Sequence, residues 1–298
     1  MVVPNFLICG APKAGTSSLH AWLADHPEAL GSTEKETYFC VDPGSHMHRP
    51  GANVSDGLEG YAQYFDLRSK SKPKILLEST PSYLYSETAL RYVPDLPSAP
   101  KCLFVVREPG QQIYSLFRYF QSNWSWIPAS LRFSEYLSVL RQPTDTQQFR
   151  GNELAQNALG NARYVEHLLP WRDRLGPERM MVTTFDRLKH DPKGLTQEVA
   201  AWLGLDPAFY ESYRFPRENE TYAVRSPALQ RVNVAIRARL PKGAAYRALR
   251  EIYRRFNTRP PLDPESEDRV LIERLAQEYA QANHRLREEF NLDLPGWA

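Results

Sequence analysis

Four short runs of apolar residues stand out along the chain, and none of them alternates with polar residues. Strands that read as continuous apolar runs are typical of a parallel sheet covered by helices on both faces. The pattern therefore predicts four buried parallel strands, at residues 5–9, 74–78, 101–106 and 179–185.

Between these runs, apolar residues recur at helical spacing. A helix is expected after residue 16, ending at Pro27, and another from Pro109 after the third strand, because proline suits the first turn of a helix. A longer helical pattern covers 152–171 and is expected to end at Pro170. Alternating strands and helices predict an α/β domain with a central parallel sheet.

The C-terminal part of the chain is expected to be helical. Asp263 and Pro264 form a predicted N-cap and first-turn pair for a terminal helix. Its apolar face would consist of Leu271, Leu275, Tyr279, Ala282, Leu286 and Phe290. Residues 41–58, rich in Gly, Pro, Ser and Asn, predict a long loop. We expect one domain over 1–298, with a helical part from about 226 packing on the core.

Composition places the chain among ordinary globular proteins, with 298 residues, of which 42% are hydrophobic and 24% charged. A net charge of +2 gives no argument for nucleic acid binding. Three cysteines cannot form a framework of several disulfides, and two lie in apolar runs, so a reducing compartment is expected. No run reaches the length of a membrane helix, and the N-terminus lacks a charged region typical of a signal peptide. These features predict a cytoplasmic protein.

The first strand is followed by "GAPKAGTSSL", residues 10–19. An ATP-binding P-loop has its lysine after the second glycine, whereas here Lys13 precedes Gly15. A strand, a glycine turn and a helix place backbone amides around an anion, assisted by the helix dipole. The loop therefore predicts a cradle for a phosphate or an isosteric group. An ordinary strand-to-helix turn with a surface lysine would give the same short pattern.

A second predicted anion site follows the third strand, which ends at Arg107, with Ser115 eight residues later in the next helix. Ligands of open α/β sheets bind beyond the carboxyl ends of the strands, so both sites would open on the same edge. One ligand with two separate anionic groups fits this arrangement better than a triphosphate does.

These two motifs resemble those of the sulfotransferases that use 3′-phosphoadenosine 5′-phosphosulfate (PAPS). The resemblance implies a P-loop-NTPase-like, three-layer α/β/α fold, with PAPS as donor, 3′,5′-bisphosphoadenosine (PAP) as product, and no metal. It places Arg107 and Ser115 at the 3′-phosphate. On the 5′-phosphosulfate side it places Lys13, Ala14, Gly15, Thr16, Ser17 and Ser18.

The string "STEKETYFC", residues 32–40, resembles the Lys-Glu-x-x-Phe-Phe segment of the carbohydrate (heparan sulfate-type) branch, with Tyr38 in place of the first phenylalanine. The resemblance implies that Glu36 is the general base for the acceptor hydroxyl, while Lys13 stabilises the departing phosphate. Glu34 is the nearby competitor. Without the resemblance, the run would be interpreted as a solvated charge pair.

The stretch "LLESTPSYLYS", residues 76–86, holds no histidine, which the cytosolic branch uses as its base. It resembles the Glu-Lys-Thr-Pro-x-Tyr segment of the carbohydrate branch, with Ser79 where lysine is usual. Glu78, Thr80 and Tyr83 are therefore expected at the acceptor. The missing lysine weakens the case for a sulfated polysaccharide acceptor. His46 and His48 lie in the long loop, where they either reach the site or form a surface pair.

Three further regions carry weaker predictions. The aromatic side chains at 118–133, Tyr119, Phe120, Trp124 and Trp126, belong either to the apolar wall of an acceptor pocket or to the core. Arg225 and Ser226 fall where the family closes a loop over the 3′-phosphate, although a structural turn fits equally well. Eight arginines and one lysine between 231 and 259 indicate a solvated helix face or a docking surface for an acidic carrier protein.

The sequence thus predicts a PAPS-dependent O-sulfotransferase acting on a small-molecule, lipid or glycan hydroxyl. A P-loop kinase using ATP is the enzymatic alternative, which would require a lysine after Gly15 and magnesium-binding carboxylates. A nucleotide-binding module without turnover is the other alternative, in which Glu36 would be replaceable without consequence.

Overall fold

A computed structural model describes residues 1–142, 148–216, 223–224, 226, 229, 232–233, 253, 257–259 and 263–298. Its centre is a parallel sheet of five strands in the order β2-β3-β1-β4-β5. The strands are β1 (Phe6–Gly10), β2 (Ala29–Gly31), β3 (Ile75–Glu78), β4 (Lys101–Val106) and β5 (Met180–Thr184). The four predicted strands are confirmed, while β2 was not predicted because its three residues form no apolar run.

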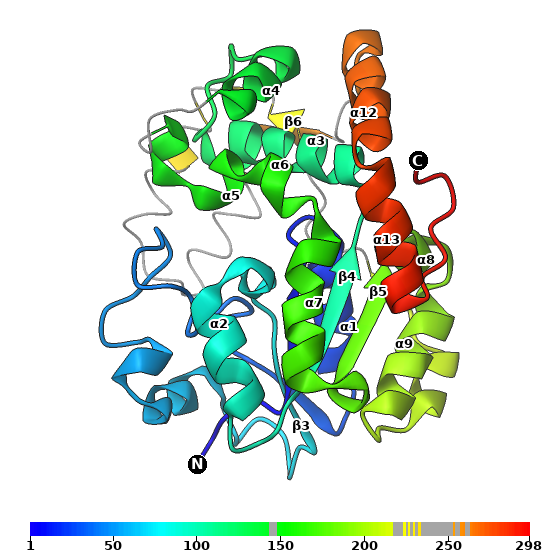
Figure 1. Ribbon diagram of the computed structural model, residues 1–298. Coiled ribbons are helices and arrows are strands. Elements are labelled where there is room, and N and C mark those ends of the chain that lie inside the picture. Colours follow the sequence, from blue (N-terminus) through cyan, green and yellow to red (C-terminus); the bar gives the residue numbers. More distant parts are fainter. Residues whose placement is uncertain are drawn as a thin grey trace.

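Helices cover both faces of this sheet, which confirms the predicted three-layer α/β/α architecture (Figure 1). On one face, α1 (Thr16–Ala24) packs beside α9 (Pro192–Trp202), and Trp202 contacts Phe6 of β1 edge to face. On the other face lie α2 (Glu87–Tyr92), α7 (Tyr164–Leu175) and α13 (Ala280–Phe290), and Trp171 contacts Phe104 of β4. Burial of such aromatic pairs stabilises the packing of the helices on the sheet.

A second group of helices lies beyond the carboxyl ends of the strands, at the top of Figure 1. It comprises α3 (Pro109–Tyr119), α4 (Phe133–Arg141), α5 (Glu153–Gln156), α6 (Ala158–Asn161) and α12 (Ser266–Glu278). These helices share an apolar cluster of their own, in which Phe117, Tyr136 and Leu275 are buried. Two hydrophobic cores therefore meet at the edge where the sequence places its ligand.

The remaining elements are short. Helix α8 (Phe185–His190) directly follows β5, and β6 (Ala223–Val224) pairs antiparallel with β7 (Thr258–Arg259). The predicted loop at 41–58 consists of turns and one 3₁₀ turn at Val54–Asp56. Within the described part of the chain, no helix has the length and apolar character needed to cross a membrane.

Two helix predictions were wrong in detail. The pattern predicted as one helix over 152–171 is divided among α5, α6 and α7. Helix α7 does not end at Pro170 but continues to Leu175, since Leu168 and Trp171 are buried on either side of the exposed proline and hold the helix across it. The predicted terminal helix is two helices, α12 and α13, separated at Tyr279. Its N-cap is Glu265 rather than Asp263.

Tyr279 occupies the break because its side chain is anchored elsewhere. Its backbone leaves the helical region (φ −93°, ψ 2°), and its hydroxyl donates to the carbonyl of Leu159 at 2.6 Å. Both halves still pack on the rest of the protein, α12 against α3 and α13 against α7. The C-terminal helices thus brace both hydrophobic cores.

Candidate functional site

The loop between β1 and α1 turns sharply at the carboxyl edge of the sheet. Lys13 and Gly15 both have positive φ, 66° and 83°. A Cβ on Gly15 would lie 2.4 Å from Cδ2 of Leu188 and 3.0 Å from Cδ2 of Phe185, so only glycine fits there. The carbonyl of Pro12 accepts a hydrogen bond from Nε2 of Gln112 at 3.1 Å, which ties the loop to α3. The cradle is therefore built by packing rather than by the motif alone.

Arg107 follows β4 and reaches this loop. Its Nη1 donates to the carbonyl oxygen of Lys13 at 3.1 Å, and its guanidinium lies over the ring of Phe185 at 4.7 Å. The ammonium of Lys13 lies 4.1 Å from the ring centroid of Tyr119. The two cations therefore lie at the same edge of the sheet, as the two anion motifs predicted.

Burial, followed by the charge of Arg107, lowers the pKa of Lys13 to about 8. Two desolvated cations that repel each other favour an anion between or beside them, because the anion offsets both costs. This electrostatic arrangement suits a ligand with more than one negative group.

A cavity of about 1590 Å³ opens along this edge and collects most of the predicted residues. From the two anion motifs it is lined by Lys13, Gly15, Thr16, Ser17, Ser18, Arg107 and Ser115. Ala14 is fully buried and does not line it. Ser226 does not line it either, and its backbone N–H donates to Oδ1 of Asn257 at 2.8 Å. Arg225 and most of the basic stretch 231–259 lie outside the described residues.

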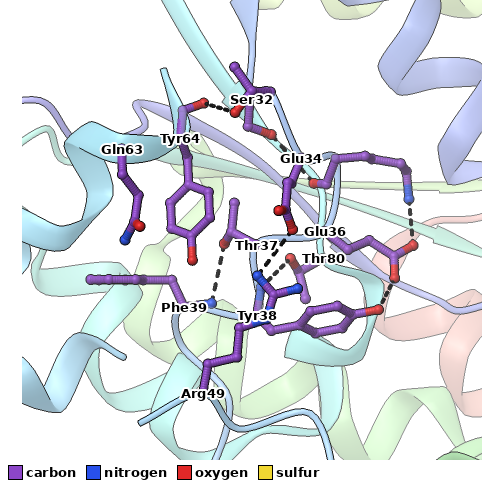
Figure 2. A network of polar contacts seen from close by, with 12 residues as sticks. Ser32, Glu34, Glu36, Thr37, Tyr38, Phe39, Arg49, Gln63, Tyr64 and Thr80 are labelled. Carbon is purple, nitrogen blue, oxygen red and sulfur yellow. Dashed lines mark hydrogen bonds and ion pairs between the residues drawn. The ribbon is translucent and has the colours of Figure 1, made fainter. Parts of the chain in front are cut away.

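Glu36 lines the same cavity, with 37% of its side chain exposed (Figure 2). Its Oε1 lies 3.0 Å from Nζ of Lys35, and its Oε2 accepts a hydrogen bond from the hydroxyl of Tyr38. Burial alone would raise the pKa of Glu36, but the charge of Lys35, the Tyr38 hydrogen bond and the charge of Lys13 together lower it. Glu36 is therefore ionised near neutral pH, as a proton acceptor must be.

Glu34, the competing carboxylate, also lines the cavity but is engaged differently. Its Oε2 lies 3.0 Å from Nη1 of Arg49, with which it forms a salt bridge. The guanidinium of Arg49 is also 5.6 Å from the ring of Tyr38, so Glu34 joins the support of Tyr38 (Figure 2).

Glu78, Thr80 and Tyr83 do not line the cavity, although acceptor contacts were expected of them. Glu78 is fully buried, and its Oε1 accepts from the hydroxyls of Thr37 at 2.6 Å and Thr80 at 2.8 Å. Its Oε2 accepts from the hydroxyl of Tyr61 at 3.0 Å. Burial raises the pKa of Glu78, and the hydroxyl hydrogen bonds oppose that shift only in part.

This buried network supports the segment that carries Glu36. The hydroxyl of Tyr83 accepts from the backbone N–H of Cys40 at 3.0 Å, and the N–H of Ser79 donates to the carbonyl of Lys35 at 3.1 Å. Ser79, which replaces the usual lysine, hydrogen-bonds Nδ1 of His20 at 2.7 Å. The segment at 76–86 is thus a scaffold for residues 35–40.

Aromatic residues form the other wall of the cavity. Trp126 stacks between Phe120 and Trp124, with ring centroids 5.4 and 5.0 Å away. His46 meets Trp126 edge to face at 5.8 Å, and its Nε2 lies 2.7 Å from Nδ2 of Asn152. The two tryptophans therefore line the cavity, as one of their two interpretations predicted.

Tyr119, Asn152 and His46 complete this wall. The sequence singled out Tyr119 and His46, each with an open alternative, but not Asn152. They come from α3, the turn before α5 and the long loop, and no local motif connects them. His48 does not line the cavity. Among the described residues, no three His, Cys, Asp or Glu side chains gather as metal ligands would.

Comparisons with known proteins agree with this geometry. Residues 3–225 match the family model described as a sulfotransferase domain. The chain is 26% identical over 207 residues to the human bifunctional heparan sulfate N-deacetylase/N-sulfotransferase 3, and 24% over 217 residues to protein 1 of that name from Caenorhabditis elegans. These matches cover 70% and 71% of this chain but only 23% of each relative.

Among solved structures, a sulfotransferase from Alicyclobacillus acidocaldarius aligns over 100% of this chain and 99% of its own, with a TM-score of 0.68 and 20% identity. This likeness concerns the fold, and it confirms the predicted P-loop-NTPase-like architecture. The family model covers well over half of the sequence, including both anion motifs and Glu36. The chain therefore belongs to the sulfotransferase family.

Proposed function

We propose that this protein transfers the sulfuryl group of PAPS to an acceptor hydroxyl, with Glu36 as general base. One observation carries the proposal: Lys13, Arg107 and Glu36 line a single cavity, with the two cations joined through the Lys13 carbonyl. A nucleotide with phosphate groups at both its 3′ and 5′ positions matches the two anion motifs. The volume of about 1590 Å³ leaves space for an acceptor beside it.

In this mechanism the acceptor oxygen attacks sulfur in line with the bond to the 5′-phosphate. A new S–O bond forms, the old S–O bond breaks, and PAP departs with the electron pair. Glu36 takes the proton of the acceptor, and Lys13 offsets the charge that develops on the departing phosphate. The first turn of α1, with Thr16, Ser17 and Ser18, adds backbone amides and hydroxyls at the same place.

The acceptor would be a small molecule, a lipid or a glycan that presents a hydroxyl between Glu36 and the tryptophan wall. An amine acceptor is the second candidate, because the relatives compared above carry N-sulfotransferase in their names. The chemistry of Glu36 is the same for both acceptors, since either nucleophile must lose a proton.

Calorimetric titration with PAP, AMP and ATP tests the nucleotide assignment. PAP should bind at least about 100-fold more tightly than AMP, the equivalent of about 3 kcal/mol for a 3′-phosphate held by a buried guanidinium. Arg107→Gln should bring PAP affinity most of the way down to that for AMP, with a much smaller effect on AMP affinity. Arg91→Gln, in α2 and away from the cavity, is the matched control. ATP binding as tight as PAP binding would instead favour the kinase alternative.

A transfer assay tests the reaction itself. PAPS radiolabelled in its sulfuryl group is supplied with 2-naphthol as a small hydroxyl acceptor, or with a de-N-acetylated heparosan oligosaccharide, which offers both amines and hydroxyls. Label in 2-naphthol, or on the sugar hydroxyls, would support O-transfer, while label confined to the sugar amines would support the second candidate. Tight PAP binding without transfer to either probe would favour a module without turnover.

A further inference from the structure

The carboxylate of Glu36 is held at both of its oxygens (Figure 2). Lys35 contacts Oε1 at 3.0 Å, and the hydroxyl of Tyr38 donates to Oε2. Lysine and glutamate stand together in the motif of the carbohydrate branch, but the tyrosine is where this sequence departs from it. A phenylalanine at that position would leave Oε2 without this donor.

Tyr38 is placed for this contact by an unusual backbone. Its φ is 55°, a left-handed conformation that is uncommon for a bulky residue and marks a fixed position. Its backbone N–H reaches Oγ1 of Thr80 at 3.5 Å, and Thr80 belongs to the buried Glu78 network. On its outer side the ring faces the guanidinium of Arg49, which is paired with Glu34. The phenol is thus confined between the scaffold and a salt bridge.

We infer that Tyr38 is a positioning residue for the general base, fixing the orientation of the Glu36 carboxylate through Oε2 and setting how strongly it holds a proton. The inference rests on the proposed function of Glu36. A carboxylate offers about four lone-pair positions, so two donors leave others for the acceptor proton. A carboxylate held at both ends loses little rotational freedom when the acceptor arrives, which is the advantage of a preorganised base.

The surrounding charges make Tyr38 a permanent donor. Lys35 and Lys13 face Glu36, while Arg49, Tyr119 and Glu36 itself face Tyr38. Burial and the neighbouring Glu36 charge raise the pKa of Tyr38 far above its ordinary value, so its proton stays on the phenol at every working pH. The hydrogen bond from Tyr38 lowers the pKa of Glu36. Removing the hydroxyl must therefore raise that pKa.

Direct titration of the carboxyl group tests this without an acceptor. Protein labelled with ¹³C at the glutamate side-chain carboxyl is titrated by NMR, and the Glu36 resonance is assigned from its loss in Glu36→Gln. In Tyr38→Phe the titration midpoint of Glu36 should move to higher pH. Incorporating 3-fluorotyrosine at position 38, whose phenol is a stronger donor, should move it to lower pH. A midpoint that stays in place in both proteins would overturn the inference.

Kinetics provide the second measurement, with PAPS and whichever of 2-naphthol and the heparosan oligosaccharide is sulfated. Tyr38→Phe should lower kcat about tenfold, the equivalent of one hydrogen bond to a charged group, and shift the acid limb of the kcat profile upward. KM for PAPS should stay unchanged. Tyr92→Phe, an exposed tyrosine of α2, should leave both the midpoint and the rate unchanged.

The two proposals fail in different ways. If Glu36→Gln keeps full turnover, Glu36 is not the base and the proposed function needs another one, whatever Tyr38 does to its titration. If Glu36→Gln is inactive while Tyr38→Phe keeps both the wild-type acid limb and the wild-type rate, the base stands and the role of Tyr38 is refuted.

Discussion

Glu36 and Glu78 are two carboxylates taken from neighbouring motifs, and the structure gives them opposite environments. Glu36 lines the cavity, touches Lys35 and Tyr38, and has a lowered pKa. Glu78 is fully buried among the hydroxyls of Thr37, Thr80 and Tyr61, and burial raises its pKa. Both matched the family pattern equally well. The comparison shows that a motif identifies chemistry-bearing residues without saying which of them meets the substrate.

The two are nevertheless coupled through residue 37. Thr37 follows Glu36 directly and donates to Glu78, so the buried carboxylate holds the backbone that presents the exposed one. Neutral hydroxyls stabilise a buried carboxylate only partly, whereas a lysine does so more strongly. One carboxylate is therefore tuned for proton transfer, and the other for holding a loop.

The largest expected effect separates the two by activity. Glu36→Gln should lower turnover by about 10³-fold, within the range for loss of a general base, and leave PAP affinity unchanged. Glu78→Gln should lower turnover less than about tenfold, because it acts only through loop position. Steady-state transfer rates and calorimetric PAP titrations on both variants provide the measurement. Equal losses of turnover would mean that the two carboxylates do not have separate roles.

The loss in the free energy of unfolding should be larger for Glu78→Gln than for Glu36→Gln, the reverse of the order expected for turnover. In Glu78→Gln one amide oxygen replaces two carboxylate oxygens that accept from three hydroxyls, and the amide N–H groups face further donors. We expect a loss of about 2 kcal/mol in the free energy of unfolding at pH 5, measured by urea denaturation. Glu36→Gln should change it by less than about 0.5 kcal/mol, as is usual for partly exposed sites. A larger loss in the free energy of unfolding for Glu36→Gln than for Glu78→Gln would contradict the separate roles of the two carboxylates.

The pH dependence of these stabilities should also have opposite signs. The folded-state pKa of Glu78 is raised above its ordinary value of 4.5. The wild type therefore loses stability as the pH rises from 4.5 through the folded-state pKa. Glu78→Gln lacks this titration, so its deficit in the free energy of unfolding should shrink as the pH rises above 4.5. The pKa of Glu36 is lowered, so its contribution is present above 4.5 and is lost as the pH falls. Any deficit of Glu36→Gln should therefore shrink as the pH falls below 4.5.

The sheet was predictable because its strands are buried on both faces, which leaves continuous apolar runs in the sequence. Strand β2 escaped because three residues, Ala29–Gly31, are too few to form such a run. Pro170 predicted the end of α7, because proline usually terminates a helix. The helix continues past it because Trp171 and Leu175 are buried in the core. Both errors come from tertiary packing, which single-sequence patterns do not contain.

The location of the site was predictable where a residue's place at the cavity follows from its own motif, as for Lys13, Gly15 and Arg107. It was less so where two segments must meet. The contact of Tyr38 with Glu36 depends on a positive φ and a rotamer, so the tyrosine looked like a plain aromatic replacement. His46 and Asn152 meet across 106 positions, which no spacing rule connects.

The smallest expected effect isolates one hydroxyl of the buried network. Tyr61→Phe removes the donor to Oε2 of Glu78 and should cost about 1 kcal/mol in the free energy of unfolding, with turnover retained. Tyr213→Phe is the matched control, because Tyr213 makes the same hydroxyl–carboxylate bond to Asp25, at 2.6 Å, but in an exposed setting. Its cost should stay below about 0.5 kcal/mol, since water replaces a lost partner there. Equal costs would show that burial does not strengthen the hydrogen bonds to Glu78. The reason for assigning Glu78 to the scaffold and Glu36 to the chemistry would then disappear.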